Sequence, residues 1–167
     1  MKNSVGTITI LAMGALVLGG CGQSESATSS PAAEMAAKAT SLVPLIDPNT
    51  ASAAALGAVA GLDAAAVDAI VAGRPFATPG ELHAAIGSLM DEATQKAVYS
   101  AVFVKIGLNS AADADMRLIP SSLTPGKLAH EFEEYRPYDS IEQFQREMSK
   151  YVSADEVANL TRYVTLD

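Results

Sequence analysis

The chain has 167 residues with 11 Lys and Arg against 19 Asp and Glu, a formal net charge of −8. Residues 47–106 contain 3 basic and 6 acidic residues, and residues 107–167 contain 6 and 11, so both parts are acidic. This balance disfavours nucleic acid as a partner, and a single Cys excludes a disulfide within one chain.

Residues 1–20 are predicted to be a lipoprotein signal peptide. Lys2 gives a positive start, and the apolar stretch from Val5 to Leu18 has the size of a signal-peptide core rather than of a membrane span. Leu-Gly-Gly-Cys at 18–21 resembles the bacterial lipoprotein cleavage site, which implies that Cys21 carries the lipid. An ordinary secretory signal followed by an unrelated Cys is the alternative interpretation.

Residues 21–45 are predicted to be a flexible, disordered tether. They are mostly Ser, Ala, Thr and Pro, with too few large apolar side chains to offset the entropy of ordering. Gly22 follows the Cys at the position where lipoproteins retained at the inner membrane tend to have Asp. The resemblance therefore implies an anchor in the outer membrane, with the folded part facing the periplasm.

The rest of the chain is predicted to be one unit present twice, at 46–106 and 107–167. Arg-Pro-Phe at 74–76 returns as Arg-Pro-Tyr at 136–138, and Asn-Thr-Ala-Ser at 49–52 returns as Asn-Ser-Ala-Ala at 109–112. Apolar positions that match are Ile70 and Phe132, Leu82 and Phe144, Ile86 and Met148, and Val98 and Leu160. The offset rises from 60 to 62, which places two extra residues near 120–126.

Each unit is predicted to contain four to five short helices and no strand, so the fold class is all-α. In the first unit, Thr50 or Ser52 caps the first helix, and a second helix covers 64–72. In the second unit, Ser110 and Asp113 have capping-box spacing, and a helix covers 125–135.

Caps at equivalent positions begin the third helix of each unit. These caps are Thr78 and Ser140. The last helix is predicted to carry Val98 and Val102 in the first unit, and Val157, Leu160 and Val164 in the second.

The segment from Ile46 to Phe76 resembles the helix-hairpin-helix unit of competence-type DNA-uptake (ComEA-like) proteins, and Gly107 to Tyr138 resembles it more loosely. The shared parts are Asn-Thr-Ala-Ser, a short helix, a Gly-containing hairpin, a second helix and an exit ending in Pro-Phe. In that family, the hairpin glycines let backbone amides approach a phosphate beside a helix N-terminus. The resemblance implies sequence-independent DNA binding, although units of this kind also contact proteins in other families.

The first hairpin keeps only part of the family pattern. Gly61 matches the first glycine and Leu62 the apolar residue, whereas Asp63 stands in place of the second glycine. A carboxylate there is expected to cap the next helix and to repel an anion. No Lys or Arg lies between Asp47 and Arg74, which disfavours DNA contact by this hairpin.

The second hairpin offers a candidate phosphate contact of a different kind. It has three hydroxyls, a displaced glycine and one cation, which are Ser121, Ser122, Thr124, Gly126 and Lys127. Three glutamates follow within two helical turns. The alternative interpretation is a capped helix start with a solvated Lys.

Four other basic side chains have structural interpretations. His83 and His130 have no Cys or His at metal-ligand spacing, so no metal site is predicted. Arg74 and Arg136 are expected to pack under the following aromatic ring or to cap carbonyls at the helix end.

An acidic stretch and several tyrosines allow two interpretations each. The acidic residues are Glu131, Glu133, Glu134, Asp139 and Glu142. They are expected to form a solvated face, with a docking surface for a basic partner as the alternative. The tyrosines at 135, 138 and 151 fit either a contact patch or the core.

These features predict a non-catalytic binding or adaptor module. No catalytic arrangement, cofactor or small-molecule substrate is predicted. The preferred partner is an envelope protein, contacted from a lipid anchor in the membrane. Sequence-independent DNA binding is the alternative, and it is disfavoured by the net charge. A simple structural role near the membrane is a third possibility.

Overall fold

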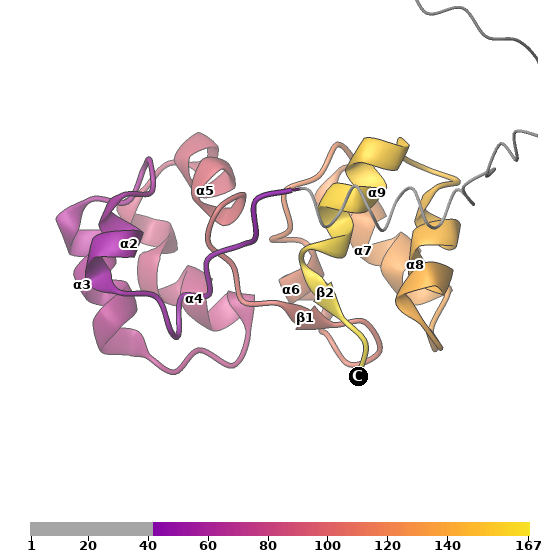
Figure 1. Ribbon diagram of the computed structural model, residues 1–167, viewed down its shortest axis with the longest axis horizontal. Coiled ribbons are helices and arrows are strands. Elements are labelled where there is room, and N and C mark those ends of the chain that lie inside the picture. Colours follow the sequence, from indigo (N-terminus) through magenta and orange to yellow (C-terminus); the bar gives the residue numbers. More distant parts are fainter. Residues whose placement is uncertain (1–41) are drawn as a thin grey trace, which may run out of the picture.

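The computed structural model describes residues 42–167, which are mostly helical (Figure 1). The first half contains α2 (Ala53–Gly57), α3 (Ala64–Gly73), α4 (Pro79–Ile86), the 3₁₀ helix η1 (Gly87–Leu89) and α5 (Glu92–Tyr99). The second half contains α6 (Asp113–Met116), α7 (Pro125–Glu134), α8 (Ile141–Met148) and α9 (Ala154–Thr161). The helices predicted over 64–72 and 125–135 are confirmed to within one residue. The predicted signal peptide, Cys21 and nearly all of the predicted tether lie outside the described residues.

Three of the predicted helix caps that use a hydroxyl are confirmed. The hydroxyls of Ser52, Thr78 and Ser140 accept from backbone amides in the first turns of α2, α4 and α8. The connection between α6 and α7 is eight residues long, against six between α2 and α3, which agrees with the predicted two-residue insertion. Local sequence therefore sets where these helices begin.

Two short strands, the first of which begins at the last residue of the first unit, differ from the prediction that no strand is present. β1 (Ile106–Gly107) pairs in parallel with β2 (Val164–Thr165), and in the first half Ile46 forms a parallel bridge with Val102. The prediction that Val102 and Val164 belong to the last helices is wrong, because α5 and α9 end before them. In each half the incoming and outgoing segments instead bond to each other, for example Ile106 N–H to the Tyr163 carbonyl at 2.9 Å.

The Asn motif is bonded to the Arg-Pro-aromatic segment in the same way in both halves. Asn49 Nδ2 donates to the Phe76 carbonyl at 2.9 Å, and Phe76 N–H donates to Asn49 Oδ1 at 2.7 Å. Asn109 makes the same two bonds with Tyr138, at 3.0 and 2.7 Å. Both Arg–Pro peptide bonds are cis. The shared motifs are therefore parts of one contact that is made twice.

The two arginines complete this contact. Arg74 Nε donates to the Pro48 carbonyl at 2.5 Å, and its Nη2 donates to the Ala51 carbonyl at 2.6 Å. Arg136 bonds the carbonyls of Leu108 and Ala111 at 2.6 and 2.9 Å. Arg74 and Arg136 therefore have the expected structural role. The carbonyls that they bond lie just before the first helix of each half, not at the end of the second helix.

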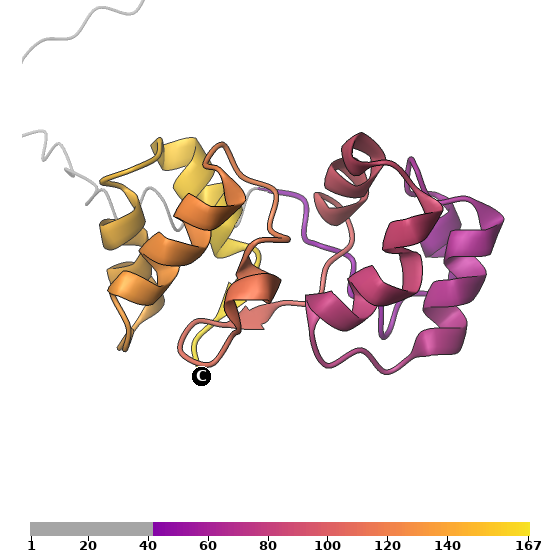
Figure 2. The same ribbon diagram turned by 180° about the vertical axis from the view of Figure 1, so that it is seen from behind.

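The two halves lie side by side (Figures 1 and 2). Their buried apolar side chains form one cluster. The rings of Phe103 and Tyr163 meet edge to face across the junction, with centroids 5.0 Å apart. Gly80 N–H donates to Asp115 Oδ1 at 2.8 Å, which ties α4 to α6. Leu45, at the end of the predicted tether, also packs on this core. Within residues 42–167 no helix combines the length and the hydropathy of a membrane span.

Candidate functional site

The first bend, between α2 and α3, is closed by its own carboxylate. Asp63 Oδ1 accepts from the Ala66 N–H at 2.8 Å and so caps α3, as predicted. The side chain of Leu62 is buried beneath the bend. An amide that could face a phosphate is therefore already bonded, and the bonded group carries negative charge.

Gly61 allows this bend to pack closely against α5. Its φ is +94°, and a Cβ at this position would lie 2.9 Å from Thr94 Cγ2 and 3.2 Å from Val98 Cγ2. The backbone therefore approaches α5 closely, in a conformation that favours glycine. Close packing on α5 accounts for this glycine without a ligand.

The second bend, between α6 and α7, is also bonded within the chain. Ser121 Oγ accepts from Leu123 N–H at 3.1 Å, and Ser122 N–H donates to Glu156 Oε1 at 2.9 Å. Glu156 belongs to α9, so a carboxylate from another helix occupies this amide. No local sequence signal marks Glu156, because it lies 34 residues from Ser122.

The remaining residues of the predicted phosphate site have different surroundings. Thr124 precedes α7 but makes no side-chain capping bond, and a Cβ on Gly126 would lie 3.1 Å from Arg117 Nη1. Arg117 itself is paired with Asp113. The Lys127 ammonium lies over the Tyr151 ring, 5.6 Å from its centroid. Ser122, Gly126 and Lys127 thus lie against different groups of the chain, which are Glu156, Arg117 and Tyr151.

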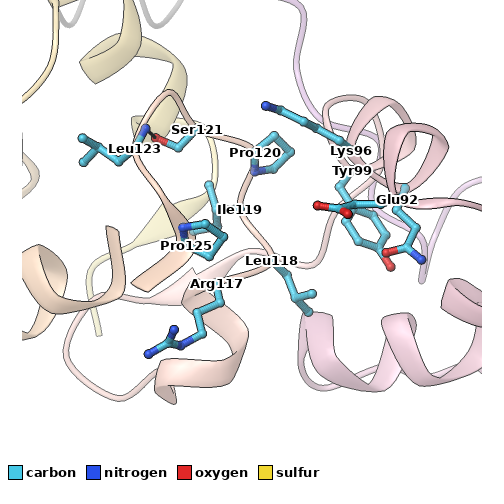
Figure 3. Close-up of a pocket in the computed structure, with 11 residues that line it drawn as sticks. Glu92, Lys96, Tyr99, Arg117, Leu118, Ile119, Pro120, Ser121, Leu123 and Pro125 are labelled. Atoms are coloured by element: carbon cyan, nitrogen blue, oxygen red, sulfur yellow. Dashed lines mark hydrogen bonds between the residues drawn. The ribbon is translucent and has the colours of Figure 1, made fainter. Parts of the chain in front are cut away.

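A cleft of about 260 Å³ lies between α5 and the second bend (Figure 3). Its lining is Glu92, Gln95, Lys96 and Tyr99 from α5, with Arg117, Leu118, Ile119, Pro120, Ser121, Leu123 and Pro125 from the opposite side. The second-bend side is largely apolar apart from Arg117, and Glu92 and Lys96 place charged groups on the α5 side. An apolar surface with a charged rim suits the side chains of a protein partner.

Tyr99 is fixed at the α5 side of this cleft. Its hydroxyl and His83 Nδ1 share a hydrogen bond of 2.8 Å, and its ring meets Phe103 edge to face. Burial raises the pKa of Tyr99 to about 12, so its hydroxyl is neutral at physiological pH. His83 thereby holds a cleft residue, a role that its sequence context does not predict.

No protein family, curated protein or solved structure matches the chain. Among residues 42–167, no three His, Cys, Asp or Glu side chains come together in the way metal ligands do. Function is therefore inferred from the two bends and the cleft.

Proposed function

We propose that the chain is a non-catalytic adaptor built from two helix-hairpin-helix units, which binds a protein partner in the cell envelope. One observation carries this proposal. One amide at the bend of each half is bonded to a carboxylate of the chain itself. The Ala66 N–H donates to Asp63, and the Ser122 N–H donates to Glu156. A phosphate would have to displace a negative group at each bend.

The contact surface in this proposal is the cleft between α5 and the second bend. Its apolar side chains, including Leu118 and Leu123, supply area that a partner would remove from water. Lipidation at Cys21 would hold the adaptor at the outer membrane, facing the periplasm, within reach of envelope proteins.

Site-specific crosslinking tests the cleft as the contact surface. A photoreactive residue at position 123 should give one discrete envelope-protein adduct, and Leu118→Glu should abolish it, because a charge would enter the apolar lining. The matched control places the photoreactive residue at position 71, on α3, where Val71 is exposed. Equal adducts from both positions, or no discrete adduct, would contradict the proposal.

Sequence-independent DNA binding is the second candidate function. It is favoured by the uncapped first turn of α7, where the Arg117 guanidinium lies against Gly126. This function predicts micromolar or tighter duplex binding by the full chain, with a steep inverse salt dependence that Lys127→Glu weakens. A titration at low and moderate salt separates the two functions, because the protein-partner function predicts no salt-sensitive retention on DNA.

A further inference from the structure

A cluster of six polar and aromatic side chains lies between α7 and the end of α8, away from the cleft. We call it the tyrosine–lysine cluster; its members are Lys127, Glu131, Tyr135, Glu147, Lys150 and Tyr151. The hydroxyls of Tyr135 and Tyr151 are 2.6 Å apart, so the two rings are joined by a hydrogen bond. None of the six residues lines the cleft.

Each ring of the pair has an ammonium of the chain over it. The Lys150 Nζ lies 4.7 Å from the centroid of Tyr135, and the Lys127 Nζ lies 5.6 Å from the centroid of Tyr151. Lys150 also bonds the Glu147 carboxylate, to which Arg146 pairs at 3.6 Å. The cluster is therefore a place that already accommodates alkylammonium groups against aromatic rings.

Glu131 is buried beneath the pair and has an unused acceptor. Its residue is only 5% exposed. Hydrogen bonding with Tyr135 and with Glu131 raises the pKa of Tyr151. Glu131 Oε2 has no hydrogen-bond partner among the described residues. A buried carboxylate oxygen without a donor is unfavourable, and it is satisfied by a group that brings both an N–H and positive charge.

The first half provides an internal reference for what the fold requires. The counterparts of the six residues, at the offset of 62, are Ala65, Ala69, Gly73, Ala85, Ser88 and Leu89. The first half has the corresponding helices α3 and α4 and the same Asn–Arg contact without any of these polar groups. The helical framework therefore does not need the cluster. The six residues that replace these small or apolar first-half residues lie together in the second half.

We propose that the tyrosine–lysine cluster is a binding site for a primary alkylammonium group, such as a lysine side chain of a partner protein. The free oxygen of Glu131 accepts from the ammonium, and the faces of Tyr135 and Tyr151 surround its charge. Lys127 and Lys150 hold these faces in the free protein and give way to the incoming group. An anionic ligand is opposed by the buried carboxylate.

Titration of the full chain with an acetylated tri-lysine amide peptide, followed by NMR, tests this site. Saturable shifts are expected at Tyr135 and Tyr151, and Glu131→Gln should weaken binding by about tenfold. The matched control is Glu133→Gln, which removes one exposed carboxylate from the same helix and should change the affinity less than about twofold. Absence of saturable shifts, or equal weakening by both variants, would overturn the proposal.

Two further variants keep the test decisive if Glu131→Gln fails to fold. Lys127→Ala and Lys150→Ser install the first-half residues and remove the ammoniums that compete for the rings. Each should tighten tri-lysine binding about threefold or more. Lys105→Ala removes an exposed cation outside both the cluster and the cleft, with the same change in net charge, and an equal effect from it would show general electrostatic attraction only.

Discussion

The carboxylate of Asp167 makes, in the second half, the hydrogen bonds that the carboxylate of Asp47 makes in the first. Asn49 N–H donates to Asp47 Oδ1 at 2.9 Å, and Asn109 N–H donates to Asp167 Oδ1 at 2.8 Å. In each half the hydroxyl of the next residue donates to the other carboxylate oxygen. The same turn is thus held by a local side chain in one half and by a distant one in the other.

This exchange predicts a rescue between positions 107 and 167. Asp167→Ala should lower the unfolding midpoint in urea, because the amide of Asn109 loses its acceptor. Gly107 stands at the position of Asp47, and a Cβ there would collide with the Asp167 carboxylate, so Gly107→Asp alone should also destabilise. The double variant should recover most of the midpoint. Additive losses would contradict the exchange.

The bonds to Asp167 also predict an acid-dependent contribution to stability. Hydrogen bonds from Ser110 and Asn109 lower the pKa of this carboxyl in the folded state. Its contribution is therefore full above the unfolded pKa, about 4, and is lost as the pH falls through the folded value. Urea midpoints of the wild type and Asp167→Ala should differ at pH 7 and converge toward pH 2. A constant difference would show that the charge has no part.

Loss of Arg136 should destabilise the second half strongly. Arg136→Ala leaves the carbonyls of Leu108 and Ala111 without their charged donor, at a cost of about 2–3 kcal/mol in the free energy of unfolding. Arg136→Lys should recover less than half, since an ammonium cannot reproduce the planar fork. Arg146→Ala, an exposed arginine on α8, is the control and should cost less than about 1 kcal/mol.

Two glycines in the first half should respond oppositely to alanine. Gly61→Ala should cost about 1–3 kcal/mol, because φ is positive and the new methyl group would meet Thr94 and Val98. Gly57→Ala places a methyl group where nothing lies within 4 Å, at the end of α2, and should be neutral or stabilise by about 0.5 kcal/mol. Chemical denaturation of both variants checks this difference.

Alkaline pH should destabilise the fold through its buried tyrosines. Burial raises the pKa of Tyr99 to about 12, so the neutral form is favoured in the folded state. Stability is then full below the unfolded pKa of about 10 and falls as the pH rises toward 12. Tyr99→Phe should make this fall shallower, as measured by urea midpoints between pH 9 and 12. Its absorbance titration should also lose a late-ionising phenol.

Features that depend on neighbouring residues could be predicted from the sequence. Thr78 and Ser140 cap the helices that follow them, and Pro125 begins α7, because each acts within one helical turn. The capping role of Asp63 belongs to the same class. In these cases the residue type and its spacing determine the hydrogen bond.

Features that depend on distant residues could not be predicted in this way. The capping box proposed for Ser110 and Asp113 is wrong, because the Ser110 hydroxyl bonds Asp167 and α6 begins after Ala112 without a side-chain cap. Glu131 was assigned to a solvated face but is buried against the tyrosine pair. Both outcomes follow from contacts with other parts of the fold. A local sequence pattern contains no information about such contacts.

The parallel pairing of the first and last segments of each half has a mechanical consequence. The chain enters the first segment at one end of the pair and leaves the last segment at the opposite end. Tension along the polypeptide therefore pulls Ile46 past Val102, and Ile106 past Val164, in shear. The interstrand bonds share the load rather than breaking one after another. When a unit is held at one terminus and pulled at the other, its paired first and last segments therefore resist the force directly.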